Sequence, residues 1–432
     1  VDATLVNLGG AATAAIGALT ADRERLRALL DGFAELTEPD SGPGVTRLAY
    51  TPLERRAHAV FAAELADLGA AVRTDAAGNT IAELPGTDPA APAIGTGSHL
   101  DSVPNGGRFD GIVGVVAAME TARLVVRHDA AHRHPLRFVV FAAEEGARFG
   151  QACTGSRIVA GLTSSDDLPG KRDADGVSFA DAMAAIGLDP ARVGEARWDP
   201  AGWAAFVELH IEQGSVLEST GRRVGVVDAI SGSTRLRIDL AGRASHSGGT
   251  PMHLRADAAA AAAEIVLLAE SVALRAAAWG TRATVGRIDV APGSMTTIAG
   301  SAALWVDVRG LDIDRQQRAA AEIVEGAEAA CARRGVRLTA TPLAETPPVP
   351  LPAAVRDTLV AGCRDLGLDP AVLPSGASHD AQQVNEVTPT GMIFIPSRDG
   401  ISHDPAEHTD LDDVALGTTV LAASLLRLDA EL

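Results

Sequence analysis

The stretch Gly95–Val116, GTGSHLDSVPNGGRFDGIVGVV, constrains the fold of this chain more than any other. Its apolar approach is typical of a buried strand, and that strand ends on His99. A polar, glycine-rich loop then carries Asp101 and Asp110, and the apolar run that follows is typical of a helix. Because ligands of open α/β sheets bind at the carboxyl edge of the strands, the stretch predicts a ligand site at such an edge.

Further strands and helices of the same kind follow along the chain. Residues 136–143, LRFVVFAA, form a continuous β-branched and aromatic run, which predicts a central buried strand that ends beside Glu144 and Glu145. Other predicted elements are strands at 203–213 and 391–396, a hairpin at 72–84, and helices at 22–36, 51–68 and 111–126. Strands that alternate with helices predict an α/β layer.

The pattern changes character near Val227. An alternating segment, an alanine-rich helix, two further strands and a second helix follow there, at 234–240, 255–274, 283–290, 302–309 and 315–335. This β-α-β-β-α order predicts a small α+β domain with one antiparallel sheet, and the proline cluster at 346–352 predicts the linker out of it. With 432 residues, two domains are expected, so 1–227 and 346–432 would form one discontinuous domain around an insert at 228–345.

Composition excludes several classes of protein. A net charge of −19, with acidic and basic residues well mixed, opposes binding to nucleic acid and to anionic membranes. No segment is apolar enough to predict a membrane span, and the N-terminal segment lacks the basic region of a signal peptide. The three widely spaced cysteines, Cys153, Cys331 and Cys363, predict a reducing compartment, and therefore a cytoplasmic location. No base is visibly paired with Cys153 in the sequence, which favours a residue that is buried or incidental.

Five side chains with metal-ligand chemistry lie at or near predicted strand ends: His99, Asp110, Glu145, His210 and His403. Imidazole nitrogens and carboxylate oxygens suit Zn²⁺ and similar cations. Asp110 has a short side chain in a glycine-rich loop, which makes it the best candidate to bridge two ions about 3.5–4 Å apart. Each of these residues is weak support alone, and their joint placement at strand ends predicts a metal site.

The neighbours of these residues suggest further roles. Glu144 and Glu145 are adjacent and project differently, so one can bind metal while the other acts as a general base. Asp101 can accept the second ring N–H of His99 and so orient that ring. The pair His379–Asp380 favours structural support. By themselves, His246 is interpreted as a turn residue and Arg309 as part of a surface salt bridge.

Five motifs occur in order along the chain: GSHLDSVPNGGRFDGIVGV, FAAEEGARFG, ELHIEQG, GRASHSGGTPM and GISHDPAEHT. Together they resemble the hydantoinase/carbamoylase family of amidases. That family is the branch of the di-zinc aminoacylase and carboxypeptidase superfamily that holds N-carbamoyl-L-amino acid hydrolases, allantoate amidohydrolases and β-ureidopropionases. The resemblance implies a two-domain, di-zinc metallopeptidase-like fold, in which a mixed-sheet catalytic domain carries an inserted α+β dimerisation lid.

The resemblance also implies roles for individual residues. Two divalent ions (Zn²⁺, or Mn²⁺, Co²⁺ or Ni²⁺) would be held by His99, Asp110, Glu145, His210 and His403, with Asp110 bridging, Glu144 as general base and Asp101 orienting His99. His246 would reach the site of the partner subunit in a homodimer and stabilise the oxyanion. Arg309 would clamp the substrate carboxylate, and Gln213 and Gly376 would contact its ureido or amide end.

One departure from the family concerns the substrate. Relatives usually carry an asparagine, an apolar pair, proline and glycine before the last lid strand, whereas this chain has Thr296-Thr297-Ile298-Ala299-Gly300. Thr296 would replace the asparagine amide with a hydroxyl that reaches less far and offers one donor. His408, where the family commonly has tryptophan, is a smaller departure.

The sequence therefore predicts a cytoplasmic, homodimeric, metal-dependent amidohydrolase that cleaves a linear C–N bond in an N-carbamoyl-L-amino acid or related ureido acid. The expected route is attack by metal-activated water, with Glu144 as general base. Alternatives on the same scaffold are an aminoacylase, a dipeptidase or an allantoate amidohydrolase. A non-catalytic binding protein is the remaining alternative, and it would be favoured by a missing ligand or base, of which none is missing.

Overall fold

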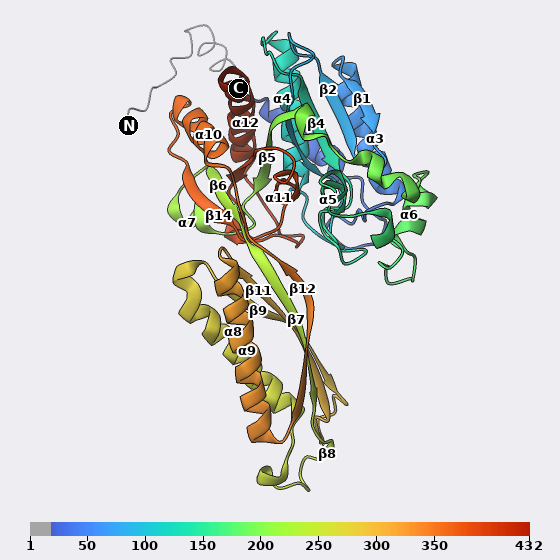
Figure 1. Ribbon diagram of the computed structural model, residues 1–432, viewed down its shortest axis with the longest axis vertical. Helices are drawn as coiled ribbons and strands as arrows, with labels where there is room; N and C mark the ends of the chain where they lie inside the picture. The colour runs from blue at the N-terminus through green and yellow to red at the C-terminus, as the bar shows by residue number, and fades with distance from the viewer. Residues whose placement is uncertain (1–18) are drawn as a thin grey trace. The chain divides into compact units, whose positions relative to one another are not determined.

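The computed structural model describes residues 19–432 (Figure 1). The chain divides into two compact units, one comprising Leu351–Leu432 and the chain up to Asp228, the other Ala229–Pro350. The second unit matches the insert predicted at 228–345 closely at its N-terminal limit, but it ends at Pro350 instead of residue 345. The reason is that the last strand of the insert continues to Thr346 and a short strand at Val349–Pro350 follows it.

A nine-stranded sheet forms the centre of the first unit. Its strands are β1 (Ala71–Thr74), β2 (Thr80–Leu84), β3 (Ala93–His99), β4 (Leu136–Phe141), β5 (Trp203–Ile211), β6 (Gly225–Ile230), β13 (Val349–Pro350), β14 (Ala371–Ser375) and β15 (Thr390–Ile395). The last two residues of β6 and strand β13 fall within the residues of the second unit. The helices of this unit are α2 (Arg23–Ala34), α3 (Pro52–Asp67), α4 (Ile112–Arg127), α5 (Thr154–Val159), α6 (Phe179–Ala185), α7 (Val216–Thr220), α10 (Ala353–Asp365), α11 (Asp380–Val384) and α12 (Leu411–Glu431).

The order of the strands brings several strand ends to one edge. The sheet runs β1-β2-β4-β3-β5-β15-β6-β13, with β14 paired to β6. The four central strands, β4, β3, β5 and β15, are parallel, and the flanking pairs are antiparallel. The carboxyl ends of β3, β4, β5 and β15 therefore lie at the same edge, which is where an open α/β sheet binds ligands. The predicted α/β class with a mixed sheet is confirmed.

Both faces of the parallel strands are buried, as their continuous apolar runs predict. Along β5, Val207 and Leu209 belong to one apolar cluster, which includes residues of α4 and α12. Phe206 points the other way, into a second cluster that includes Val384 of α11. His210 follows Phe206 with the period of a strand and lies on the same face, so the packing of β5 decides the side from which this histidine enters the site.

Local signals explain where two helices of this unit begin. Thr51 caps α3, because its hydroxyl accepts the amide hydrogen of Glu54 and Pro52 occupies the first turn, which confirms the predicted start. Helix α4 has no side-chain cap and begins after Gly111, whose φ of +68° is in the left-handed region. A Cβ atom at Gly111 would lie 2.3 Å from Cε1 of His99, so glycine is required for this close approach.

The second unit is an antiparallel sheet of order β12-β7-β11-β9, with two helices against one face (Figure 1). Its elements are β7 (Gly232–Ala241), β8 (Ser245–His246), α8 (Ala258–Ala276), β9 (Arg282–Ala291), β10 (Thr297–Ile298), β11 (Ser301–Gly310), α9 (Ile313–Arg334) and β12 (Arg337–Thr346). The predicted β-α-β-β-α order lacked β12. Pro342 argues against a central strand, and the structure accommodates it in an edge strand with a register shift between Pro342 and Ala344.

Among residues 19–432, the structure contains no helix that combines the length and the apolar character needed to cross a lipid bilayer.

Candidate metal centre

The carboxyl edge of the central sheet gathers the five predicted ligands. His99 is the last residue of β3, Glu145 follows β4, and His210 is the penultimate residue of β5. Asp110 immediately precedes Gly111, after which α4 begins, and His403 lies in the loop after β15. The structure thus brings together side chains that are more than 300 positions apart in the sequence.

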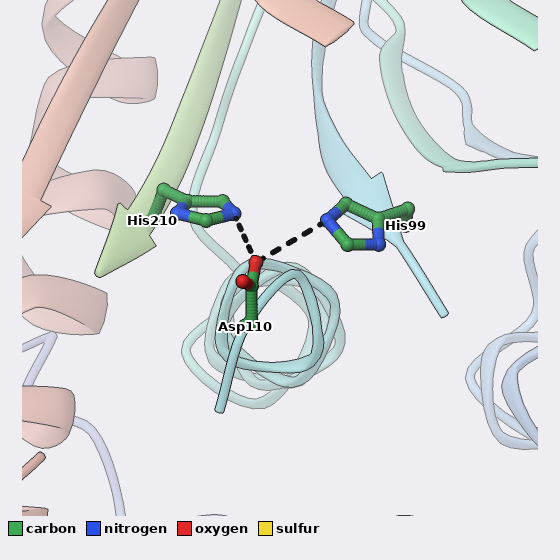
Figure 2. A group of neighbouring side chains, drawn as sticks. All are labelled: His99, Asp110 and His210. Atoms are coloured by element: carbon green, nitrogen blue, oxygen red, sulfur yellow. Dashed lines mark ion pairs between the residues drawn. The ribbon is translucent and has the colours of Figure 1, made fainter. Parts of the chain in front are cut away.

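The first group of possible ligands is fully buried. Ligand atoms of His99, Asp110 and His210 all lie within 4.8 Å of one another. The Nε2 atoms of His210 and His99 are 3.1 and 3.6 Å from Oδ1 of Asp110, as the dashed lines in Figure 2 indicate. Two imidazoles and a carboxylate oxygen that converge in this way fit a divalent cation such as Zn²⁺.

The second group shares Asp110 with the first. Ligand atoms of Asp110, Glu145 and His403 also lie within 4.8 Å of one another. Nε2 of His403 is 3.3 Å from Oδ2 of Asp110 and 3.4 Å from Oε2 of Glu145. Asp110 therefore presents Oδ1 to one group and Oδ2 to the other. This is the arrangement that a carboxylate shared between two cations requires.

Backbone strain is concentrated in the loops that form this site. Four non-glycine residues in these loops have a positive φ. They are Ala143 (+56°), directly before Glu144, then Cys153 (+55°), Gln213 (+55°) and His403 (+59°). Such conformations cost about 1–3 kcal/mol each and persist only where surrounding contacts enforce them. The loops of this edge are therefore held by their contacts rather than by local preference.

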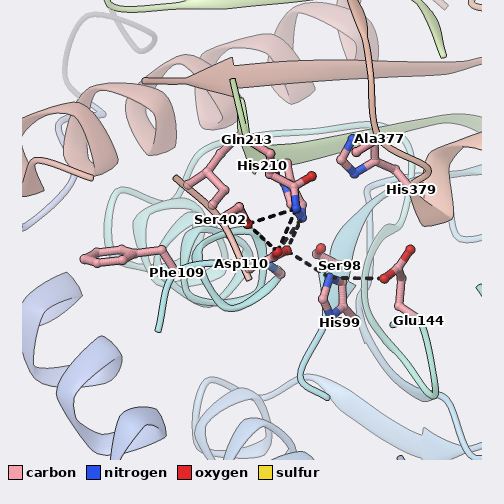
Figure 3. A network of polar contacts seen from close by, with 12 residues as sticks. Ser98, His99, Phe109, Asp110, Glu144, His210, Gln213, Ala377, His379 and Ser402 are labelled. Carbon is pink, nitrogen blue, oxygen red and sulfur yellow. Dashed lines mark hydrogen bonds and ion pairs between the residues drawn. The ribbon is translucent and has the colours of Figure 1, made fainter. Parts of the chain in front are cut away.

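Glu144 lies beside the first group and is 6% exposed. Its Oε2 is 3.7 Å from Nε2 of His99, and the contact is drawn in Figure 3. The carboxylate of Asp101 accepts the backbone N–H groups of Glu144 and Glu145 at 3.0 and 3.1 Å. These two bonds fix the turn that presents both glutamates.

The contact between Asp101 and His99 differs from the prediction. Nδ1 of His99 lies 3.0 Å from the main-chain carbonyl oxygen of Asp101 and 3.7 Å from its Oδ1. The ring therefore donates to the main chain, while the Asp101 carboxylate accepts the two backbone amides of the glutamates. Asp101 is placed to orient His99 through its carbonyl group.

The electrostatics of the site fit a cation. Burial, reinforced by the charges of Asp110 and Glu144, raises the pKa of Glu145 well above its ordinary value. Burial also raises the pKa of Glu144. For Asp110, burial acts upward, but hydrogen bonds from His210, His403 and His99 hold its pKa well below the ordinary value. Buried carboxylates this close repel one another, and bound divalent cations would relieve that repulsion.

Of the two interpretations of Cys153, buried or incidental, the buried one is confirmed, and the residue also contacts Glu144. Its Sγ lies 3.0 Å from Oε1 of Glu144, and its backbone N–H donates to the carbonyl oxygen of Glu144 at 2.6 Å. Burial raises the pKa of Cys153 well above the ordinary value, so the thiol stays protonated and donates to the carboxylate. The contact could have been suspected from the sequence, because Cys153 and Glu144 lie in the same glycine-rich loop.

Four further polar residues at this edge had no predicted role at the site: Ser402, Glu407, Glu208 and Ser98. Glu208 accepts the hydroxyl of Ser98 at 2.8 Å and the backbone N–H of Ala381 at 2.8 Å. It shares a face of β5 with His210, and this two-residue spacing could have identified it. Ser402 and Glu407 flank His403 in the motif GISHDPAEHT.

The pair His379–Asp380 makes the supporting contacts that were predicted for it. Nε2 of His379 lies 2.9 Å from the hydroxyl of Ser375, and its ring meets that of His210 edge to face, with centroids 4.5 Å apart. Ser156 donates its hydroxyl to Oδ1 of Asp380 at 2.5 Å, which links α5 to α11. These contacts join the layers under the metal centre.

Gln213 and Gly376 were both predicted to contact the substrate. The amide nitrogen of Gln213 donates to Oδ2 of Asp110 at 2.7 Å and to Ser402 at 3.1 Å, so this side chain is engaged with the shared carboxylate. Gly376 lies in the loop after β14. Their contacts with substrate stay a prediction.

Two residues predicted for the lid lie close together in the second unit. His246 is in β8, which pairs with β10 so that His246 stands opposite Thr297. Its Nδ1 accepts the backbone N–H groups of Gly248 and Gly249 at 3.0 and 3.1 Å, so the neutral ring carries its proton on Nε2 and can donate from there. The side chain of Thr296 is exposed next to this pair of strands.

Arg309 lies on another strand of the same unit. It is in β11, and its Nε donates to Oδ2 of Asp307 at 2.9 Å. The ion pair that the residue alone suggests is therefore present. Its predicted contact with a substrate carboxylate stays a prediction.

Known proteins resemble this chain over most of its length. A model of peptidase family M20/M25/M40 matches residues 95–427. The N-carbamoyl-L-amino acid amidohydrolase of Geobacillus stearothermophilus is 43% identical over 398 residues, which is 92% of this chain and 96% of that protein. The allantoate amidohydrolase of Escherichia coli K12 is 36% identical over 392 residues, which is 90% of this chain and 94% of that protein.

A solved structure agrees in fold. The amidase of the hydantoinase/carbamoylase family from Burkholderia multivorans superimposes with a TM-score of 0.86 at 32% identity, and the match covers 95% of this chain and 98% of that one. The residues matched by the family profile, 95–427, include all five ligands. The chain belongs to the peptidase M20/M25/M40 family, in its hydantoinase/carbamoylase group of amidases.

Proposed function

We propose that this metal-dependent amidohydrolase cleaves the carbamoyl group from an N-carbamoyl-L-amino acid or a closely related ureido acid. The observation that carries the proposal is the carboxylate of Asp110, whose two oxygens face two separate ligand groups beside the buried carboxylate of Glu144. The substrate class follows from the 43% identical relative that is an N-carbamoyl-L-amino acid amidohydrolase.

The five ligands would hold two divalent cations, His99 and His210 on one side of Asp110, and Glu145 and His403 on the other. Bound at these positions, the cations would polarise the ureido carbonyl group and lower the pKa of a water molecule. Zn²⁺ is the first candidate, because imidazole and carboxylate are ligands that it favours, and Mn²⁺, Co²⁺ and Ni²⁺ are the others.

Glu144 would move the proton in this reaction. Its Oε1 accepts the thiol of Cys153, which leaves Oε2, on the side of His99, to take a proton from the attacking water. The same carboxyl group would return this proton to the amino nitrogen as the bond from that nitrogen to the carbonyl carbon breaks. Water is consumed and the amino acid is released together with carbamic acid, which breaks its own C–N bond to give ammonia and CO₂.

Residues of the second unit would select the substrate. We propose that the guanidinium of Arg309 binds the substrate carboxylate and that Nε2 of His246 donates to the oxyanion as it develops. Thr296 offers a single hydroxyl where the family resemblance implies an asparagine amide, which supports a difference in side-chain or acyl preference.

The substrate class is tested with a panel on metal-reconstituted protein: N-carbamoyl, N-acyl and dipeptide derivatives of the same L-amino acid, and allantoate. We expect kcat/KM to be highest for the N-carbamoyl compounds, and we expect Arg309→Ala to raise KM by about 10- to 100-fold through loss of a bidentate charge pair. Highest activity on N-acyl amino acids or dipeptides would replace the proposal with an aminoacylase or dipeptidase. Highest activity on allantoate would assign the substrate of the 36% identical relative.

A homodimer is the proposed assembly, formed through the second unit. Strand β9 is an outer strand of its sheet, with Ile288 and Val290 43% and 41% exposed. Helix α8 of the same unit exposes Leu267 and Leu274, at 65% and 70%. An open edge strand beside exposed apolar side chains is a template for pairing with a second copy. In that dimer, His246 would serve the site of the partner subunit.

Light scattering tests this assembly. We expect a mass of twice the 44.2 kDa of one chain, and a shift toward the monomer in Ile288→Asp and Val290→Asp because a charge on a buried edge strand is costly. Val372→Asp is a matched control, since Val372 is 52% exposed in the first unit. A monomeric wild-type protein, or β9 variants that dimerise like the control, would contradict the proposal.

We also propose a cytoplasmic location. Cys153, Cys331 and Cys363 are buried as free thiols, which is typical of proteins in reducing compartments. Cell fractionation followed by the assay of the preferred substrate tests this location, and activity confined to a secreted or periplasmic fraction would contradict it.

A further inference from the structure

Glu407 joins two loops that lie far apart in the sequence. It is 3% exposed, in the loop that follows β15 and precedes α12. Its Oε1 accepts the backbone N–H groups of Phe109 and Asp110 at 2.8 and 3.0 Å. Its Oε2 accepts the hydroxyl of Ser402 at 2.9 Å. One buried carboxylate therefore holds the backbone at Asp110 to the loop that carries Ser402 and His403.

Ser402 continues this connection to the carboxylate of Asp110. Its Oγ also lies 2.9 Å from Oδ2 of Asp110, so its one hydrogen is donated to either Glu407 or Asp110, and it accepts the amide of Gln213 at 3.1 Å. The amide of Gln213 also reaches Oδ2 of Asp110, at 2.7 Å. Figure 3 shows Ser402 and Gln213 directed at Asp110 from one side, with His99 on the other. Glu407, Ser402 and Gln213 together fix both the backbone and the carboxylate of Asp110, and we call them the Asp110 clamp.

The chain leaves room for this contact at Gly107. A Cβ atom there would lie 2.0 Å from Oε1 and 2.5 Å from Oε2 of Glu407. Any residue other than glycine would push the carboxylate away from the amides of Phe109 and Asp110. The close approach of the two loops thus depends on a glycine, Gly107, in the loop before Asp110 and on a buried glutamate, Glu407, in the loop after β15.

Stability alone is a poor reason for this arrangement. Burying Glu407 near a second buried carboxylate, that of Asp110, costs free energy, and apolar packing would hold two loops together without that cost. The arrangement instead directs hydrogen bonds at the one side chain that both ligand groups share, and at the loop of His403, whose φ of +59° needs enforcement.

We propose that Glu407, acting through Ser402, is a positioning residue that holds Asp110 and His403 in the geometry required for metal binding. The inference rests on the proposed metal centre, and it adds Glu407 and Ser402, which are not among the predicted metal ligands or substrate contacts. Side chains that orient metal ligands in this way typically contribute 10- to 100-fold to metal affinity or activity.

The experiment compares Glu407→Ala, Glu407→Gln and Ser402→Ala with the wild-type full-length protein. Zn²⁺ affinity is measured on metal-free protein by competition with a fluorescent chelator, alongside the melting temperature of the metal-free form. We expect Glu407→Ala to bind Zn²⁺ about 10- to 100-fold more weakly, with kcat lowered and KM nearly unchanged. Glu407→Gln should recover most of the affinity, because its amide oxygen can still accept the two backbone N–H groups while its NH₂ group donates to Ser402.

Glu120 supplies a matched control for loss of a buried glutamate. It is 0% exposed on α4 and accepts the backbone N–H of Asp22 at 2.8 Å, as Glu407 accepts backbone N–H groups. Glu120→Ala should lower the melting temperature without changing Zn²⁺ affinity. The inference is overturned if Glu407→Ala binds Zn²⁺ like the wild type, or if its loss equals that of Glu120→Ala.

Two further outcomes keep the test decisive. If Glu407→Ala does not fold, Ser402→Ala decides, since it removes one hydroxyl and should still weaken Zn²⁺ binding; unchanged affinity in that variant overturns the inference. If the wild-type protein binds neither Zn²⁺, Mn²⁺, Co²⁺ nor Ni²⁺, the proposed function itself fails. If only the inference about the clamp is wrong, the wild-type protein still binds metal and turns over substrate, so the two failures can be told apart.

Discussion

Replacing Glu144 with glutamine is expected to leave metal content unchanged and to lower kcat by about 10²- to 10⁴-fold, the usual contribution of a general base. The substitution keeps the shape of the side chain, and its amide oxygen can still accept the thiol of Cys153. What it removes is the oxygen beside His99 that would take the proton. Metal analysis and steady-state kinetics on the same preparation give the two numbers.

Glu212→Gln is the control for this variant. Glu212 is 7% exposed in the neighbouring motif ELHIEQG, and its carboxylate accepts the backbone N–H groups of Val216 and Leu217 at 2.7 and 2.8 Å. Its substitution alters a buried glutamate without touching either ligand group. Turnover of Glu144→Gln near that of Glu212→Gln would remove Glu144 from the proton transfer.

The second large effect is expected at Asp110. Because its two oxygens face two ligand groups, Asp110→Ala should lose both bound ions, whereas His403→Ala should lose only the ion on its own side. Loss of both ions removes several kcal/mol of transition-state stabilisation, so kcat/KM should fall by about 10³-fold or more. Elemental analysis after dialysis gives ions per chain, and chelator treatment of the wild type should reproduce the loss of activity.

The comparison of these two variants separates a shared carboxylate from an ordinary ligand. Equal stoichiometry in Asp110→Ala and His403→Ala would mean that the two ligand groups do not act as separate sites. Restoration of chelator-treated wild-type protein by added Zn²⁺, Mn²⁺, Co²⁺ or Ni²⁺ identifies the ions that support turnover. Recovery of Asp110→Ala with the same additions would contradict the bridging role.

Much of the fold could be predicted from local pattern. Continuous apolar runs identified β3 and β4, a threonine–proline pair identified the start of α3, and alternation identified the hairpin β1–β2, whose register pairs Ala71 with Glu83. These features depend on neighbours a few positions apart. Strand β12 was missed because Pro342 argues against a central strand, and only the sheet shows that β12 is an edge strand.

The sequence by itself determined the residue types of the candidate site and the strands that end there. Parallel strands share a carboxyl edge, so the proximity of side chains at their ends can be predicted from the strands alone. The family motifs indicate the same five ligands. The roles of those residues stay predictions until the variants are measured. Their gathering into two groups around Asp110 is a property of the folded chain.

The tertiary structure alone decided how those side chains are held. Asp101 meets His99 through its carbonyl rather than its carboxylate, Cys153 donates to Glu144, and Glu407 accepts the amide of Phe109, 298 positions away. Whether such a hydrogen bond forms depends on the distance between donor and acceptor to within a few tenths of an ångström. Here donor and acceptor lie on loops that no periodic sequence pattern relates to each other. Local sequence places a residue on an edge, and only the packing of distant loops selects its partner.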